Sequence, residues 1–305
     1  MAQLLLGASA GACDPSHPPL YWQELTDMAE ISATMVKKLR DETQLPMMDC
    51  KKALAEAGGD MELAKQRLRE AGKKFMGSRS DRTTEEGRVA VYSSLSPAAG
   101  AIIELQVESA PVAKNEEVIQ LANDLAKQLA TGPGAKTPDD LWDQPSPSQP
   151  KKTLRDVKDE LENKIREVFR LARISRVDAP AGGYVHHDGK SGVLLHVEGG
   201  NEQLAKEVAM HVAAMKPKAV NVEDLDPAIV EKEKSILMEA ARQEGKPENI
   251  LEKMVEGRLR NFYAETVLAE QAFIKDEKQT VGKIAAAGGM KLKKFLHWRL
   301  GGSDG

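Results

Sequence analysis

The chain contains an internal duplication of a hairpin, a strand and a helix, and this repeat restricts the fold more than any other feature. Tyr92 is followed eight residues later by Gly100 and an apolar run, and Tyr184 is followed eight residues later by Gly192 and a second such run. Each run is short, β-branched and partly alternating, as strands are, and each leads through Asn-Glu into an amphipathic helix. Two such half-domains would each bury one sheet face under helix, so we expect an α+β fold.

The two copies differ in the path from strand to helix. In the first copy this path is Ser109–Lys114, whereas Gly199-Gly200 suffices in the second. Extra chain at the end of a strand is where binding residues tend to lie, so we expect the first path to be a binding loop. The alternative is a tolerated insertion, because surface loops accept extra length at little cost.

A small helical module of about forty residues precedes the duplication, near the lower size limit for independent folding. Caps and glycines predict its three helices, which are Ala33–Arg40, one that opens at Pro46 and closes at Gly58, and Met61–Ala71 ending at Gly72. Its exposed feature is the pair Lys51 and Lys52 beside Met47 and Met48. An ordinary solvated face is the alternative interpretation of these lysines.

We expect the following order of domains along the chain: a leader at 1–27, the helical head at 28–72, a linker at 73–86, and core half-domains at 87–175 and 176–305. The leader is interpreted as disordered or as a start codon assigned too early, because no basic residue precedes its short apolar run. Four further elements are predicted: a helix from Thr153 to about Ala172, a helical hairpin at 227–264, a short helix at Thr280–Ala287 and a terminal strand around Trp298.

Composition argues against several classes of protein. The net charge is -4 and aromatic residues make up only 4% of the 305 residues, so neither a basic surface nor a base-stacking platform for nucleic acid is expected. The two cysteines, Cys13 and Cys50, have no spacing pattern, which favours a reducing, cytoplasmic compartment over a disulfide framework or zinc site. No apolar run approaches the roughly 20 residues that a membrane span needs.

The sequence offers little for covalent chemistry. It contains no glycine-rich phosphate loop and no His-Glu-x-x-His. His186, His187 and Asp188 fall at the predicted tip of the second hairpin, where a solvated turn is the simplest interpretation. His211 lies on a largely apolar helix, where a packed histidine is more common than a catalyst. We therefore expect a protein-binding scaffold without a cofactor or metal, and no enzyme activity.

Several strings between Met28 and Phe273 are specific in composition and order: Met47–Leu54, Val112–Glu116, Ala209–Ala214, Glu252–Arg258 and Gln271–Phe273. Together they resemble bacterial translation elongation factor Ts, the family of guanine-nucleotide exchange factors for elongation factor Tu. The resemblance implies a ubiquitin-associated-like head, a core of two related halves and a protruding antiparallel coiled coil. It also implies a partner, elongation factor Tu, in its GDP-bound and nucleotide-free forms.

The resemblance further assigns roles to particular positions. In the family, the head, including the position of Lys51, touches the nucleotide-binding domain of the partner. The loop at Ser109, Ala110, Pro111 and Val112 reaches the partner's magnesium-binding region. The second half, through Ser191, Gly192 and His211, engages the partner elsewhere. Tighter binding of the nucleotide-free form than of the GDP form would then speed GDP release.

One departure from the family pattern leaves alternatives open. The family loop normally reads Thr-Asp-Phe-Val-Ala, whereas this chain has Ser109-Ala110-Pro111-Val112-Ala113, without the acidic and aromatic side chains. A milder departure is Gln44-Leu45-Pro46 in place of a glycine-rich turn. The second hypothesis is accordingly a scaffold or chaperone that holds elongation factor Tu with weak exchange activity. A third, RNA binding through the lysine-rich tail, is weakened by the acidic net charge.

Overall fold

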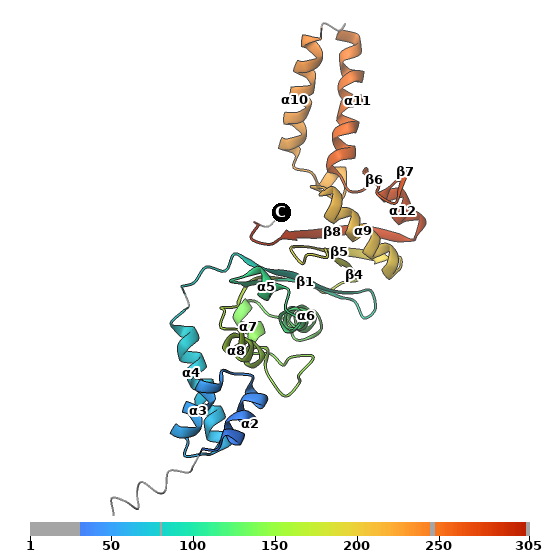
Figure 1. Ribbon diagram of the computed structural model, residues 1–305. Helices are drawn as coiled ribbons and strands as arrows, with labels where there is room; N and C mark the ends of the chain where they lie inside the picture. Colours follow the sequence, from blue (N-terminus) through green and yellow to red (C-terminus); the bar gives the residue numbers. More distant parts are fainter. Residues whose placement is uncertain (1–30, 80, 245–247, 303–305) are drawn as a thin grey trace, which may run out of the picture. The chain divides into compact units, whose positions relative to one another are not determined.

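The computed structural model describes residues 31–79, 81–244 and 248–302 (Figure 1). The expectations for the leader at 1–27 therefore lie outside the described residues. The chain divides into two compact units, Met1–Phe75 and Met76–Gly305, and each is described by itself. Helices and strands both contribute to the second unit, which confirms the predicted α+β class. Within the described residues no helix combines the length and the apolarity needed to cross a bilayer.

The first unit contains three helices that pack on one small core. They are α2 (Ala33–Thr43), α3 (Met47–Glu56) and α4 (Met61–Gly77). The Ser32 side chain accepts a hydrogen bond from the Met35 N–H, as the predicted cap requires. The predicted end of the third helix at Gly72 is wrong. Gly72 lies on the same helical face as Ala64 and Leu68 and is buried with them, so it serves close packing and does not end the helix.

The second unit begins with a three-stranded antiparallel sheet in the order β1-β2-β3. Its strands are β1 (Glu86–Ser94), β2 (Ala99–Val107) and β3 (Arg170–Val177). The connection from β2 to β3 contains α5 (Ala110–Ala113), α6 (Glu116–Thr131), α7 (Pro138–Trp142) and α8 (Leu154–Ile165). Helix α6 buries Leu121, Leu125 and Leu129 in the core shared with this sheet. The Asn115 side chain caps α6 by accepting from the Glu117 N–H at 2.8 Å.

The predicted helix from Thr153 to Ala172 is wrong beyond Ile165. Helix α8 stops at Ile165 because Arg166 takes the left-handed conformation, with φ of 67°. The Phe169 N–H then donates to the Glu162 carboxylate at 2.8 Å, and β3 pairs with β2. Val168 and Phe169 are buried as expected. Their spacing imitates a helical face, but long-range strand pairing determines their conformation.

A second antiparallel sheet has the order β4-β5-β8. Its strands are β4 (Ala181–Val185), β5 (Ser191–Gly199) and β8 (Met290–Arg299), and the elements around them are α9 (Glu202–Met215), η1 (Val222–Asp224), β6 (Ala272–Phe273), β7 (Asp276–Thr280) and α12 (Val281–Ala287). Strand β8 and helix α12 confirm the predicted terminal strand and short helix. Thr280 caps α12 through a bond to the Lys283 N–H.

The two sheets of this unit pack against each other at a small apolar cluster. It contains Val89, Ile102, Ala181, Leu194 and Trp298. Glycine permits the close approach, since a Cβ added at Gly192 would lie only 2.6 Å from the Val89 Cγ1 atom.

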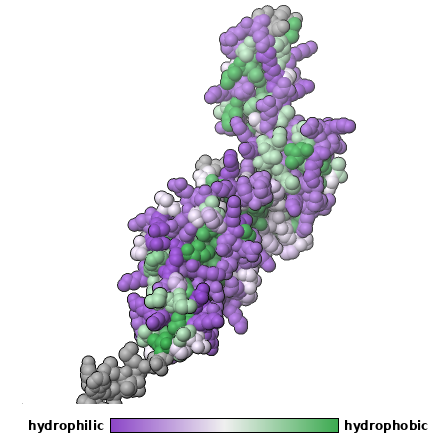
Figure 2. Space-filling view, in the orientation of Figure 1, coloured by the Kyte–Doolittle hydropathy of each residue, from purple (hydrophilic) through white to green (hydrophobic). Residues whose placement is uncertain are grey.

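Helices α10 (Pro227–Gln243) and α11 (Glu248–Thr266) run side by side and occupy the two stretches predicted to be helical (Figure 1). They pack through Ala241, Leu251 and Val255. Figure 2 shows apolar surface over this helix pair. On α10, the side chains of Ile229 and Ile236 are exposed. Asp226 caps α10 by accepting from the Ala228 N–H at 2.9 Å.

Candidate partner-binding site

The path from β2 to α6 is a single helical turn, α5, in place of the expected loop. The Ala113 N–H donates to the Ser109 carbonyl at 3.2 Å, and the Asn115 N–H donates to the Val112 carbonyl at 3.0 Å. Pro111 fits an early helical position because the N–H it lacks would have no partner there. The predicted site segment, Ser109–Val112, therefore has a defined backbone.

Burial separates the inner and outer residues of this segment. Ala113 is buried, and Val112 packs against the core that α6 shares with the first sheet. Ser109, Ala110 and Val112 are partly exposed, whereas Pro111 is exposed. The segment consequently presents a proline ring and adjacent backbone to solvent, with no charged side chain on Ala110 to Val112.

The first end of the segment is held by Glu167, which follows α8. One carboxylate oxygen accepts the Ser109 N–H at 3.1 Å, and the other accepts the Ser109 Oγ–H at 2.6 Å. The preceding residue, Glu108, accepts the Val168 N–H at 2.9 Å and pairs with Arg82 at 2.8 Å. Two reciprocal contacts thus join the end of β2 to the start of β3. Charge-assisted hydrogen bonds of this kind are stronger than neutral ones.

The other end of the segment is held by Arg88 on β1. Its Nη1 group donates to the Ala113 carbonyl at 3.1 Å. Burial lowers the pKa of Arg88, and its buried Nε–H has no hydrogen-bond partner among the described residues. The guanidinium also lies against Gly189 in the β4–β5 turn, since a Cβ added there would meet Nη2 at 3.3 Å. Arg88 therefore contacts both the segment and this turn.

Sequence reasoning missed Arg88 and Glu167. Glu167 is 58 residues from Ser109 and fell inside a stretch predicted to be helical, so no local pattern pointed to the contact. The Val89 N–H donates to the Gly189 carbonyl at 2.7 Å, which adds a second link between β1 and the turn before Ser191. The structure thus joins the Ser109–Val112 segment to the β4–β5 turn through β1.

Ser191 and Gly192 begin β5 and are placed largely by packing. The Ser191 Oγ lies 2.9 Å from the His297 Nε2 on the neighbouring strand β8. Burial lowers the pKa of His297, and the nearby cations Lys216 and Arg299 lower it further. Gly192 is buried against Val89, so only the half-buried Ser191 offers side-chain surface at this point.

His211 is completely buried on α9. Its Nε2–H donates to the side-chain Oε1 of Gln271 at 2.9 Å, and its Nδ1 accepts the Ile274 N–H at 3.3 Å, which specifies the neutral tautomer protonated on Nε2. Burial lowers the pKa of His211, and the Gln271 contact opposes this shift. The ring stacks on Phe273 with 5.8 Å between centroids. The Ile274 side chain, by contrast, is 39% exposed. His211 therefore holds the backbone of a residue whose side chain faces solvent.

Lys51 belongs to the first unit and is exposed on α3. Met48, at the start of the same helix, is 72% exposed, and Met47 is 48% exposed. Exposed methionines are uncommon on a surface that contacts only water, because the thioether side chain gains by burial. The solvent-facing side of α3 therefore combines a cation with adaptable apolar groups.

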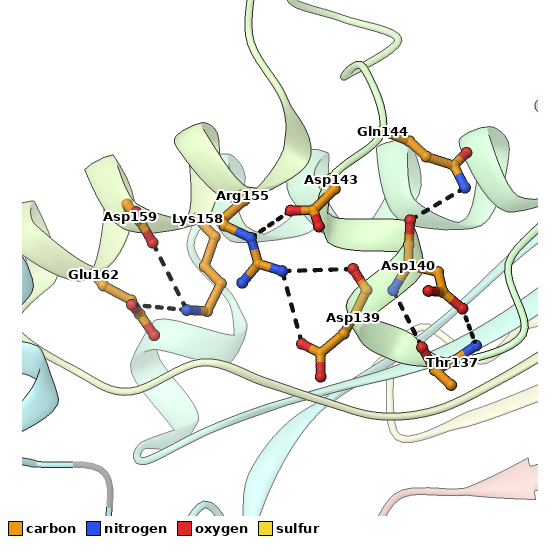
Figure 3. Close-up of polar contacts among 9 residues, drawn as sticks. All are labelled: Thr137, Asp139, Asp140, Asp143, Gln144, Arg155, Lys158, Asp159 and Glu162. Carbon is orange, nitrogen blue, oxygen red and sulfur yellow. Dashed lines mark hydrogen bonds and ion pairs between the residues drawn. The ribbon is translucent and has the colours of Figure 1, made fainter.

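A polar cluster joins α7 and α8 (Figure 3). Arg155 donates to Asp143 at 2.6 Å and lies 3.7 Å from Asp139, joining the two helices. Thr137 and Asp140 form a capping box on α7. Lys158 pairs at 3.0 Å with Glu162, the residue that also accepts the Phe169 N–H. Burial raises the pKa of Glu162, and Lys158 opposes that shift.

The second hairpin tip exposes Asp188 and Lys190, which agrees with a solvated turn. The His186 Nδ1 lies 3.2 Å from the Tyr184 hydroxyl, and the Asp188 carboxylate accepts the Lys190 N–H at 2.8 Å. His187 is exposed. Across the described ranges, no group of three or more His, Cys, Asp or Glu residues is arranged to hold a metal ion.

Known proteins match this chain over most of its length. Residues 108–302 match the family model described as "Elongation factor TS". The chain is 42% identical over 276 residues to elongation factor Ts of Azoarcus sp., an alignment that covers 90% of this chain and 92% of that protein. It is 41% identical over 290 residues to elongation factor Ts of Aquifex aeolicus, covering 89% and 98% of the two chains. The chain therefore belongs to the elongation factor Ts family.

Proposed function

We propose that this chain is an exchange factor that promotes GDP release from elongation factor Tu by stabilising the nucleotide-free form. The observation that carries the proposal is the match to elongation factor Ts proteins over 90% of the chain. Exposed methionines beside Lys51 on α3 and the exposed Pro111 on α5 are surfaces that a partner could contact. The proposal requires no cofactor, nucleic acid or membrane, and it places the activity in the cytoplasm with the translation machinery.

The physical basis is linkage between two ligands of one partner. A factor can shift an equilibrium only through a difference in affinity between two states. If the chain binds nucleotide-free elongation factor Tu more tightly than the GDP form, GDP must in turn bind the complex more weakly. The chain then speeds release by lowering the affinity for GDP, and it undergoes no covalent change.

We assign the contacts as follows, with each role a part of the proposal. The three-helix unit acts as a ubiquitin-associated-like head and uses Lys51 with Met47 and Met48 against the nucleotide-binding domain. The Ser109–Val112 segment approaches the magnesium-binding region, and it acts through backbone and shape because Ala110 and Pro111 bring neither charge nor an aromatic ring. Ser191 and Gly192 shape a second contact, and His211 acts through the Phe273–Ile274 segment that it holds. The α10–α11 pair is the protruding coiled coil of the family, beside a core of two related halves.

The test is stopped-flow release of a fluorescent GDP analogue from elongation factor Tu. Adding this chain is expected to accelerate release in a concentration-dependent way that saturates as the complex forms. The Lys51→Ala variant should need a higher concentration for half-maximal acceleration, because it loses a contact of the head, but it should still accelerate release because it retains the core contacts. Binding without any acceleration would contradict the proposal and would instead describe a scaffold, the alternative that the family membership does not favour.

A further inference from the structure

Helix α5 is too short to be stable alone. It has four residues, and a single helical turn fixes several backbone dihedrals for very few hydrogen bonds. Ser109 occupies its N-cap position, yet its side chain makes no capping bond to the helix. The hydroxyl donates to Glu167 at 2.6 Å instead. The conformation of the segment therefore depends on contacts with distant parts of the chain.

The residues around Glu167 form a firm support for its carboxylate. On one side, the Arg166 carbonyl accepts from the Arg79 guanidinium at 2.7 Å. On the other, the Val168 and Phe169 N–H groups donate to Glu108 and Glu162 at 2.9 and 2.8 Å. A carboxylate on a backbone fixed in this way orders its partners more effectively than one on a mobile surface side chain.

We propose that Glu167 is a positioning residue that holds the Ser109–Val112 segment in the geometry that contacts the partner. The inference rests on the proposed function of that segment. A segment that is ordered before binding avoids paying its ordering entropy on association. This matters more here because Ala110 and Pro111 contribute shape and not charge, so their effect depends on backbone position. Arg88 anchors the opposite end at the Ala113 carbonyl, 3.1 Å away.

The experiment measures GDP release from elongation factor Tu with Glu167→Ala, Glu167→Gln and Ser109→Ala variants of the full chain. Loss of two hydrogen bonds to a carboxylate should slow stimulated release by about tenfold in Glu167→Ala. Glu167→Gln should recover most of the rate, because an amide oxygen still accepts the Ser109 N–H and the amide group can donate to Oγ. Ser109→Ala, which removes only the Oγ–H contact, should lie between wild type and Glu167→Ala.

A double-mutant cycle separates positioning from general support of the fold. The Pro111→Gly substitution loosens the segment itself. In that background, Glu167→Ala should slow stimulated GDP release by less than about twofold, because both changes remove the same ordered contact. Amide hydrogen exchange over residues 109–115 should rise in Glu167→Ala. Glu160→Ala is the matched control: this exposed glutamate on α8 pairs with Lys152 at 2.6 Å and should change neither measurement.

Three results would overturn the inference. Glu167→Ala and Ser109→Ala could both retain the wild-type rate while wild type accelerates release normally. The cost of Glu167→Ala could be as large in the Pro111→Gly background as alone, which would identify a merely structural residue. Should Glu167→Ala fail to fold, by circular dichroism, a wild-type rate in the folded Ser109→Ala variant would decide against it. A wild-type chain that does not accelerate release overturns the proposed function first, and this inference with it.

Discussion

His211 shows how one residue can matter for a surface without being part of it. The imidazole is fully buried, yet its two nitrogens bond to Gln271 and to the backbone of Ile274. A hydrogen-bonded neutral ring in an apolar site resists protonation, which is why burial lowers its pKa. The residue thus fixes the β6–β7 segment and leaves Ile274 to face solvent.

We predict that His211 makes the stability of the second unit depend on pH. Because the folded-state pKa is lowered from 6.5, the unfolded chain binds more protons below that value, and the free energy of unfolding should fall as pH drops from 7.5 to 5.5. Urea denaturation at the two pH values should show a smaller fall in the free energy of unfolding for His211→Gln than for wild type. A pKa lowered by one unit corresponds to a difference of up to about 1.4 kcal/mol. His187→Gln, which alters an exposed histidine, should match wild type. An undiminished fall in His211→Gln would contradict the prediction.

We further predict that restoring the usual family side chains strengthens exchange. The double substitution Ala110→Asp with Pro111→Phe adds a charge and a ring at an exposed segment. GDP release should accelerate by about fivefold or more, which is the lower end of the usual coupling between two ligands of one protein. The measurement is stopped-flow release of the fluorescent GDP analogue at a saturating concentration of the chain. Ala110→Asn with Pro111→Leu is the control for size alone. No acceleration by the Asp-Phe variant would count against a role for this segment at the magnesium region.

At the scale of elements, α8 is where local pattern and tertiary structure diverge. Its start was predictable, because Thr153 and Asp156 form a capping box visible in the sequence. Its end was not, because Arg166 adopts the left-handed conformation without a glycine, and Val168 and Phe169 continue the apolar spacing. The duplicated hairpins and the terminal strand were predictable, since each has its own alternation and turn residues.

The capping box of α8 gives a prediction for that element. Thr153→Ala removes the side-chain bonds to the Asp156 N–H and carboxylate, at 3.0 and 2.8 Å, and should destabilise the helix by about 1 kcal/mol. Hydrogen exchange of the amides in residues 154–165 makes the measurement locally. Thr153→Ser keeps the hydroxyl and should stay near wild type. Equal destabilisation by both substitutions would show that the methyl group, not the cap, is responsible.

Some residues of the candidate site could be predicted from the sequence and others could not. The resemblance to the family could suggest Lys51, Ser109–Val112 and Ser191 as candidate site residues, and these stay predictions. Glu167 and Arg88 could not be suggested in this way, because each acts on residues at least 25 positions away in the chain. The burial of His211 agrees with the packed histidine expected on an apolar helix, whereas the burial of Gly192 was beyond sequence reasoning because it depends on the packing of two sheets.

For the whole molecule, the proposed function rests on binding energy that differs between two states of a partner. The chain carries a helical unit with exposed methionines and a second unit with an ordered contact segment, and each can contribute to such a difference. Contacts that favour both partner states equally would add affinity without any exchange activity.

The most direct test compares the affinity of the chain for nucleotide-free and for GDP-bound elongation factor Tu, by calorimetry in one buffer. We predict tighter binding to the nucleotide-free form by at least about tenfold, as coupling between two ligands requires. Equal affinities for the two forms, or no complex with the nucleotide-free form, would contradict the central claim.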